Sequence, residues 1–167
     1  KIREKVLGPE HPDTATSLGN LASIYKDMGN YDRALPLHQR ALKIREKVLG
    51  PEHPDTAQSL NNLASLYKEM GVYARAEPLQ QRALKIREKV LGPEHPSTAN
   101  ALNNLATLYE KMGDYTRAEP LYDRALKINE KVLGPEHRNT ASSLNNLAML
   151  YSEIGDYARA ESLYKRS

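Results

Sequence analysis

The sequence predicts an all-α fold, an α-solenoid of stacked antiparallel helix pairs, and three observations lead to it. Two series of glycines recur every 42 residues, and each copy contains two amphipathic helical patterns. The loop phrase GPEHPDTA at 8–15 also returns three times with small changes. A period of roughly 20–50 residues is typical of solenoids and similar arrays. The glycines are Gly8, Gly50, Gly92 and Gly134 in one series and Gly29, Gly71, Gly113 and Gly155 in the other.

We expect the whole chain, 1–167, to form a single repeat array. Residues 1–8 end a preceding second helix, and 9–50, 51–92 and 93–134 are three complete copies. Residues 135–167 are a fourth copy whose second helix is truncated. The chain begins without a methionine, so we expect a fragment of a longer protein. Scattered differences between the copies favour a natural array, and one position holds His38, Gln80, Tyr122 and Tyr164.

The first helix of a copy is predicted from Pro12 to Met28. His11 takes the cap position, and proline suits the first helical position because its φ is already helical. Gly29 ends the helix, since a left-handed residue costs least as glycine. Apolar residues at helical spacing predict the core-facing stripe, which consists of Leu18, Leu21, Ala22 and Tyr25.

The second helix is predicted from Tyr31 to Leu49, and Gly50 followed by a proline ends it. Its apolar stripe is Ala34, Leu37, Ala41, Ile44 and Val48. A proline lies inside this helix in three copies, where it costs about 3 kcal/mol in a regular interior. We therefore expect a kink or a slipped first turn at Pro36, Pro78 and Pro120, and a straighter helix at Ser162. The charged KIREK stretch predicts a solvated face with pairs three or four residues apart.

The loop histidines allow two interpretations, a metal or catalytic site or a capping role copied with the loop. They are His11, His53, His95 and His137. Stacked helices lie about 8–10 Å apart, so one metal cannot reach histidines from successive copies. Catalysis would need a base, an orienting group and a nucleophile in one cleft. We therefore favour the capping role and expect no metal, no cofactor and no enzyme activity.

Composition excludes several classes of function. The 167 residues include no cysteine, which rules out disulfides and thiolate chemistry and is typical of a reducing compartment, so we expect a cytoplasmic protein. The 24 basic and 21 acidic residues are interleaved, which disfavours nucleic-acid binding. No apolar run approaches the roughly 20 residues that span a membrane. Eight of the ten tyrosines, Tyr25, Tyr31 and their copies, fall on core positions.

The repeated positions resemble the tetratricopeptide repeat. The residues that carry the resemblance are Leu60, Leu63, Ala64, Tyr67, Gly71, Tyr73, Ala76 and Ala83. The 42-residue length and the phrases LNNLA, AEPL, RALKIREKVLG and EHP are similar to the repeats of kinesin light chains. The resemblance implies a right-handed superhelix whose first helices line a concave groove. It identifies the fold better than the function, because one fold serves many functions.

The groove side of the first helices carries a ladder of Asn, Ser and Thr. An asparagine amide can pair with both the N–H and the C=O of an extended peptide, whatever its side chains are. The alternative is that these residues bond the adjacent helix. Basic groove residues are offset by Asp27, Glu69, Glu110 and Glu153, which disfavours capture of a terminal carboxylate. The candidate peptide-binding residues are Asn20, Ser23, Asn61, Asn62, Ser65, Asn103, Asn104, Thr107, Asn145 and Asn146.

The function predicted from the sequence is a non-enzymatic scaffold that binds an extended peptide or a partner domain. The alternative is a structural spacer or a self-associating array without a peptide ligand. We also expect head-to-tail association through the open array ends, with Ser167 of one copy near Lys1 of the next. The partners expected are therefore peptides or proteins, with no nucleic acid and no membrane.

Overall fold

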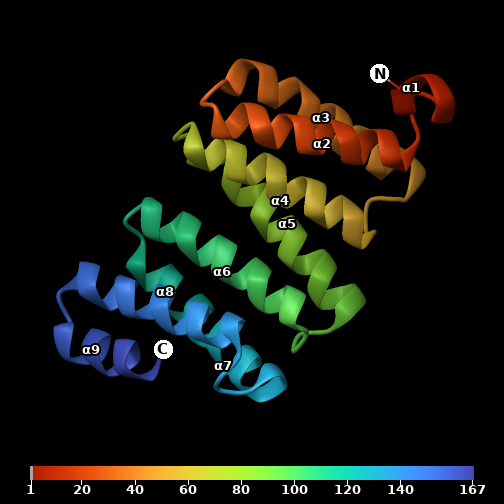
Figure 1. The fold of residues 1–167 in the computed structure, drawn as a ribbon. Helices are drawn as coiled ribbons and strands as arrows, with labels where there is room; N and C mark the ends of the chain where they lie inside the picture. Colours follow the sequence, from red (N-terminus) through yellow and green to blue (C-terminus); the bar gives the residue numbers. More distant parts are fainter. Residues whose placement is uncertain (1) are drawn as a thin grey trace. The chain divides into compact units, whose positions relative to one another are not determined.

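The computed structural model describes the backbone of residues 2–167 and the side chains from Glu4 onward. Lys1, for which the contact with Ser167 is expected, lies outside the described residues. Every regular element in the described part is an α-helix (Figure 1). The helices are α1 (Ile2–Leu7), α2 (Pro12–Asp27), α3 (Tyr31–Val48), α4 (Pro54–Glu69), α5 (Tyr73–Leu91), α6 (Pro96–Lys111), α7 (Tyr115–Leu133), α8 (Arg138–Ile154) and α9 (Tyr157–Arg166).

The helices form two compact units, one up to Ile86 and the other from Arg87, and the boundary falls within α5. In the first unit α2 packs on α3, α4 contacts both, and α1 contacts α2. In the second unit α6 packs on α7, α8 packs on α9, and α8 contacts both α6 and α7. Short turns join the two helices of each pair, which makes them antiparallel. We call α2, α4, α6 and α8 the A helices and α3, α5, α7 and α9 the B helices.

The histidines cap the A helices, as predicted. The Nδ1 atom of His11 accepts a hydrogen bond from the Asp13 backbone N–H at 3.1 Å. This bond satisfies one of the donors that the first turn of a helix leaves without a partner. The same bond forms at His53, His95 and His137, in the last case although Arg138 replaces the proline.

The loop before each A helix is held by one further side chain. The Thr14 hydroxyl donates to the Gly8 carbonyl oxygen at 2.9 Å, which ties the first turn of α2 to the end of α1. The bond recurs in the other copies at Thr56, Thr98 and Thr140. Gly29 adopts a left-handed φ of +71° after α2, as its predicted role in ending the helix requires.

The internal prolines do not displace the start of the B helices. The α3 helix runs without interruption through Pro36, and its first turn closes with a 3.1 Å bond from Ala34 N–H to the Asn30 carbonyl. The α9 helix, which has Ser162 instead, closes with an equivalent 3.1 Å bond from Ala160. The predicted slipped first turn is therefore wrong. Pro36 is exposed, so water can reach the carbonyl that the missing N–H would have bonded.

The α4 helix is buried on two sides, whereas the predicted stripe covers only one. Leu66 is 0% exposed and packs against Ala22 and Ala34 of the preceding pair. Its counterpart Ile24 is 56% exposed. Leu21, predicted to lie in the core, is 41% exposed for the same reason, since no described helix pair packs on that side of α2. The sequence stripe therefore identifies contacts within a pair and underestimates contacts between pairs.

The last B helix departs from the predicted core in a similar way. Tyr31 packs against Leu66 of the next A helix, but Tyr157 is 72% exposed. No described helix follows α9, so its outward side has no partner within the described chain. Tyr157 is therefore an exception to the prediction that these tyrosines are core residues.

The glutamate of each KIREK stretch forms an ion pair with an arginine of the next B helix, so it is not only solvated. Arg82 Nη1 of α5 lies 2.6 Å from Glu46 Oε1 of α3, and Arg124 of α7 makes the same contact with Glu88. The equivalent pairs are Arg40 with Glu4 and Arg166 with Glu130. These pairs between B helices were not predicted from the sequence, which indicated only pairs three or four residues apart along one helix.

Candidate functional site

The candidate site is the polar face of the A helices, defined by the ten predicted binding residues. None of the ten is fully buried, and Asn20 and Asn145 are exposed while the others are half-buried. The residues lie on two separate units, so each group is described within its own unit. In the first unit these are Asn20, Ser23, Asn61, Asn62 and Ser65; in the second they are Asn103, Asn104, Thr107, Asn145 and Asn146.

In the first unit Ser23 and Asn62 form hydrogen bonds along their own helices. The Ser23 hydroxyl donates to the Gly19 carbonyl at 3.1 Å, one turn earlier in α2. Asn62 Oδ1 accepts from Gln58 Nε2 at 2.8 Å, also one turn earlier. Both Asn62 and Gln58 reach solvent. These contacts hold the side chains in place on the surface without using them to join one helix to another.

In the second unit two of the ten residues serve the interior. Asn103 Nδ2 donates to Ser143 Oγ at 3.2 Å and so joins α6 to α8. The Thr107 hydroxyl donates to the Asn103 carbonyl at 2.9 Å and lies 2.8 Å from the Tyr122 hydroxyl of α7. For Asn103 and Thr107 the structure thus favours the interhelical role over ligand contact. Within the described chain, Asn145 and Asn146 make no side-chain hydrogen bond and remain open to a ligand.

Glu110 is not a groove charge, contrary to the prediction. It is 8% exposed, and its Oε2 accepts a 2.8 Å hydrogen bond from the Tyr122 hydroxyl. Burial raises the pKa of Tyr122 far above its ordinary value; the bond with Thr107 opposes this shift, and the Glu110 charge adds to it. Tyr122 therefore stays protonated and donates to Glu110. The burial of Glu110 could not be predicted from its place in the repeat, because the other copies have Lys26, Lys68 and Ser152 at that position.

A half-buried arginine in the first KIREK stretch contacts residues beside the polar face. Arg45 Nη1 donates to Ser59 Oγ at 2.8 Å and Nη2 to Thr16 Oγ1 at 3.0 Å, so α3 holds both α2 and α4. The third copy has Asn129 at this position, which donates to Ser143 Oγ at 2.9 Å. The KIREK stretch was predicted to be a solvated face, and the change from KIREK to KINEK was the only sequence signal of these contacts.

One apolar side chain interrupts the polar face. Met149 is 50% exposed on α8, at the position that holds Ser23, Ser65 and Thr107 in the other copies. It offers apolar surface beside Asn145 and Asn146. A ligand on the second unit therefore meets both amides and a thioether.

Comparison with known families identifies the family to which this helical repeat belongs. The tetratricopeptide repeat matches residues 1–47, 17–89, 60–128 and 97–167, which together span the chain. The chain belongs to the tetratricopeptide repeat family. Tetratricopeptide repeats support a protein–protein interaction scaffold, and the family is generally non-enzymatic.

Two solved structures are similar to this tetratricopeptide repeat chain over nearly all its length. BtubC (BKLC) from P. vanneervenii is 28% identical with a TM-score of 0.85, covering 98% of this chain and 68% of that one. A putative kinesin light chain with nearly identical TPR-like repeats from Podosopora anserina is 31% identical with a TM-score of 0.80, covering 99% and 78%. The resemblance to kinesin light chain repeats is therefore confirmed.

Matches to curated relatives are much shorter. Protein fem-1 homolog A from Bos taurus and from Homo sapiens is 44% identical over 41 residues, which is 25% of this chain and 6% of each relative. The tetratricopeptide repeat chain thus spans a small part of these relatives. In the part of the chain that the structure describes, no helix has the length and apolar character of a membrane span, and no three His, Cys, Asp or Glu side chains gather as metal ligands.

Proposed function

We propose that this chain is a binding scaffold that holds an extended peptide or a partner domain in the groove lined by its A helices. The proposal rests on the exposure of the second asparagine in the LNN phrase. Asn62 and Asn146 keep solvent-accessible amides, although asparagine is unfavourable inside a helix. Neither residue joins two helices by a hydrogen bond, unlike Asn103. Packing between helices does not explain these amides, whereas hydrogen bonding to the backbone of a ligand does.

Alanine substitution separates ligand contact from structural support. A peptide is first selected on the intact chain from a random display library, and its affinity is measured by calorimetry. Asn62→Ala with Asn146→Ala should weaken binding at least tenfold and leave helicity and the unfolding midpoint unchanged. Asn103→Ala is the matched comparison and should lower the unfolding midpoint, because it removes the bond to Ser143. Failure to select any peptide, or an unchanged affinity in the double variant, would overturn the proposal.

Self-association is the second candidate, supported by the open side of α2. Ile24 and Met28 are 56% and 70% exposed, while Leu66 at the position of Ile24 is fully buried by the preceding helix pair. A second copy can cover this side with the outward side of its α9, where Tyr157 and Tyr164 are exposed. Such head-to-tail contact is heterologous.

Sedimentation over a range of concentrations tests the self-association. The mass should rise with concentration, and Ile24→Glu should hold the chain monomeric because it places a charge in the contact. A monomer mass that is independent of concentration contradicts the contact and leaves the peptide proposal untouched.

A further inference from the structure

Three side chains beside the polar face of the second unit form a hydrogen-bonded group. The Tyr122 hydroxyl of α7 lies 2.8 Å from the Thr107 hydroxyl of α6 and donates to Glu110 Oε2 at 2.8 Å. Tyr122 and Glu110 are 1% and 8% exposed, so these polar groups satisfy one another where little water can reach them. In the third copy the B-helix residue thus supplies the partner that the A-helix residues need.

The same three positions in the second copy hold Ser65, Lys68 and Gln80, which form no such group. Gln80 is 3% exposed, and its Oε1 is buried without a hydrogen-bond partner. Ser65 and Lys68 are half-buried, and neither side chain forms a hydrogen bond or an ion pair within the described chain. A glutamine is shorter than a tyrosine, so its amide ends short of the place that the Tyr122 hydroxyl occupies. Three polar groups therefore lack partners at one step of the first unit.

The helices that carry Lys68 and Gln80, α4 and α5, pack together through a shared buried cluster. Residues at these two positions contact each other directly in the third copy. They are neighbours in the first copy as well, because burial and, second, the Lys26 charge lower the pKa of His38. Both neighbouring copies thus indicate that the Gln80 amide lies beside the Lys68 side chain.

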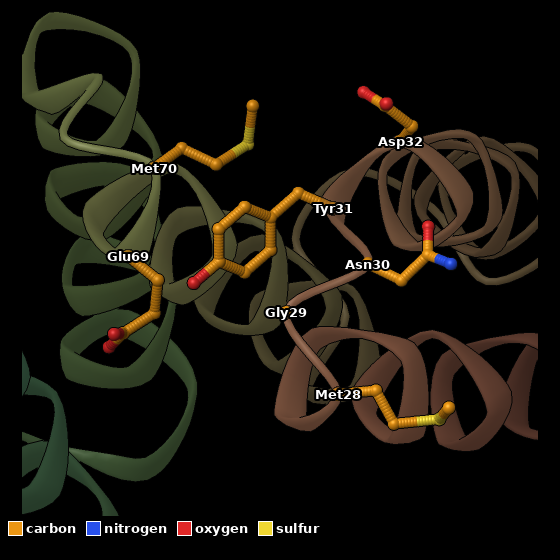
Figure 2. A pocket seen from close by; sticks show the side chains of 7 residues that line it. All are labelled: Met28, Gly29, Asn30, Tyr31, Asp32, Glu69 and Met70. Carbon is orange, nitrogen blue, oxygen red and sulfur yellow. The ribbon is translucent and has the colours of Figure 1, made fainter.

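The carboxylate that follows Lys68 does not neutralise it. In the first copy Lys26 Nζ lies 3.6 Å from the Asp27 carboxylate. The counterpart of Asp27 is Glu69, which lines a hollow beside the Tyr31 ring (Figure 2) and forms no ion pair within the described chain. The Lys68 ammonium is therefore available to a ligand.

We propose that Ser65, Lys68 and Gln80 bind the side-chain carboxamide of an asparagine or glutamine in the partner peptide, an inference that rests on the proposed peptide-binding function. The Lys68 ammonium can only donate, so it bonds the carboxamide oxygen. Gln80 Oε1 can only accept, so it bonds the carboxamide N–H. The Ser65 hydroxyl can do either, as the Thr107 hydroxyl can toward Tyr122.

A carboxamide fits these three groups better than a carboxylate does. A carboxylate pairs with Lys68 but has no hydrogen to donate to Gln80 Oε1. A buried acceptor without a donor costs more free energy than a partly exposed ion pair contributes. An aliphatic side chain satisfies none of the three groups, so the site selects a neutral group that both donates and accepts.

NMR on the intact chain tests the proposal through the Gln80 side-chain N–H signals, which are identified by their absence from Gln80→Met. The probe is a blocked Ala-Ala-Gln-Ala-Ala peptide. One matched control carries glutamate, which has nearly the same shape without a donor, and the other carries methionine. We expect saturable shifts of the Gln80 signals with the glutamine peptide, at least tenfold weaker binding of the glutamate peptide and no shift with the methionine peptide.

Substitutions in the site should remove the effect. Lys68→Met should weaken binding of the glutamine peptide at least tenfold, whereas Lys43→Met, which removes an exposed lysine of α3, should leave it unchanged. Lys68→Glu with Gln80→Tyr introduces the residues of the third copy. The tyrosine should then donate to the glutamate, as Tyr122 does to Glu110, and abolish binding without lowering the unfolding midpoint.

Failure of this site can be distinguished from failure of the scaffold. Equal affinities of the glutamine and glutamate peptides, no shift of the Gln80 signals with any of the three peptides, or full binding by Lys68→Met would overturn the carboxamide site. Selection from the random peptide library does not depend on Gln80. Selected peptides that bind the chain without a shared asparagine or glutamine would uphold the scaffold and overturn the carboxamide site.

Discussion

The Arg117 guanidinium carbon lies 4.0 Å from the centre of the Tyr109 ring, whereas Arg33 lies 5.6 Å from the equivalent ring of Tyr25. The difference follows from the N-cap residue. Asp114 accepts from the Arg117 Nε at 2.6 Å and so holds the guanidinium over the ring, and Asp156 does the same for Arg159. A cation held close to a tyrosine face is attracted by the ring, so the cap and the stacking support each other.

The second copy lacks this arrangement and can be given it. Val72 occupies the N-cap position, and Arg75 lies 5.8 Å from the Tyr67 ring. Val72→Asp should supply a side-chain cap and draw Arg75 over Tyr67, which raises the free energy of unfolding by about 1 kcal/mol. Urea denaturation followed by tyrosine fluorescence measures the change. Val72→Asn introduces the residue found at Asn30, which makes no side-chain capping bond, and should give a smaller gain. An equal gain would show that neither the aspartate cap nor the arginine is involved.

The loop histidines should be replaceable by other capping residues. His95 Nδ1 accepts from Ser97 N–H at 3.0 Å, so His95→Ala should cost about 1 kcal/mol of stability. His95→Asn should restore most of that loss, because the asparagine oxygen can accept the same bond. Thermal unfolding of the three chains tests this. If alanine and asparagine are equally destabilising, the imidazole contributes more than the cap.

His38 should make stability depend on pH. Burial and, to a lesser extent, the Lys26 charge lower the pKa of His38 from 6.5 to about 4 in the folded chain. Above pH 6.5 the residue is neutral in both states, so it has no effect. Between pH 6.5 and 4 the unfolded chain binds the proton first, so stability falls, by roughly 3 kcal/mol at most.

Other groups titrate in the same range, so a variant is needed to isolate His38. His38→Gln introduces the residue found at Gln80 and should make the stability of the chain less sensitive to pH between 6.5 and 4. Unfolding free energies of both chains at several pH values give the difference. Parallel curves for the two chains would contradict the pKa shift.

The third copy should gain stability from an arginine at Asn129. Its Oδ1 is buried without a hydrogen-bond partner, as is Oδ1 of Asn103. In the first copy the equivalent Arg45 donates to Ser59, whose counterpart is Ser143. Asn129→Arg should therefore remove one unpaired acceptor, place donors beside Asn103 Oδ1 and Ser143 Oγ, and stabilise the chain by about 1 kcal/mol. A lower urea midpoint than that of the parent chain would show that the space between α6, α7 and α8 is too small for the arginine side chain.

Local features were predicted from the sequence with little error. The A helix predicted from Pro12 to Met28 is found at Pro12–Asp27, and the B helix predicted from Tyr31 to Leu49 is found at Tyr31–Val48. Both ends depend on chemistry within a few residues, namely the histidine cap and the left-handed glycine. Such signals are complete in a short stretch of sequence, so one copy is enough to find them.

Contacts between copies were harder to predict. Leu66 packs against the preceding helix pair, and Arg45 donates to Ser59 of the following one. A helical stripe defined for one partner helix cannot distinguish a second buried side from an exposed one. Glu110 was expected in the groove, but it is buried because the variable position opposite it holds Tyr122. The ten candidate binding residues were predicted as one set. The structure divides that set, because Asn103 and Thr107 bond inward while Asn145 and Asn146 do not.

The ion pairs between successive B helices have a consequence for how such a chain can change in length. Glu46 pairs with Arg82, and Glu88 pairs with Arg124, so the first two copies offer the same glutamate to the same arginine of the copy that follows. Removal of residues 51–92 would bring Arg124 opposite Glu46 and restore an identical pair. Recombination between near-identical gene segments can therefore add or delete whole copies without leaving an unpaired charge. The number of copies can vary while the ion pairs between successive B helices stay the same.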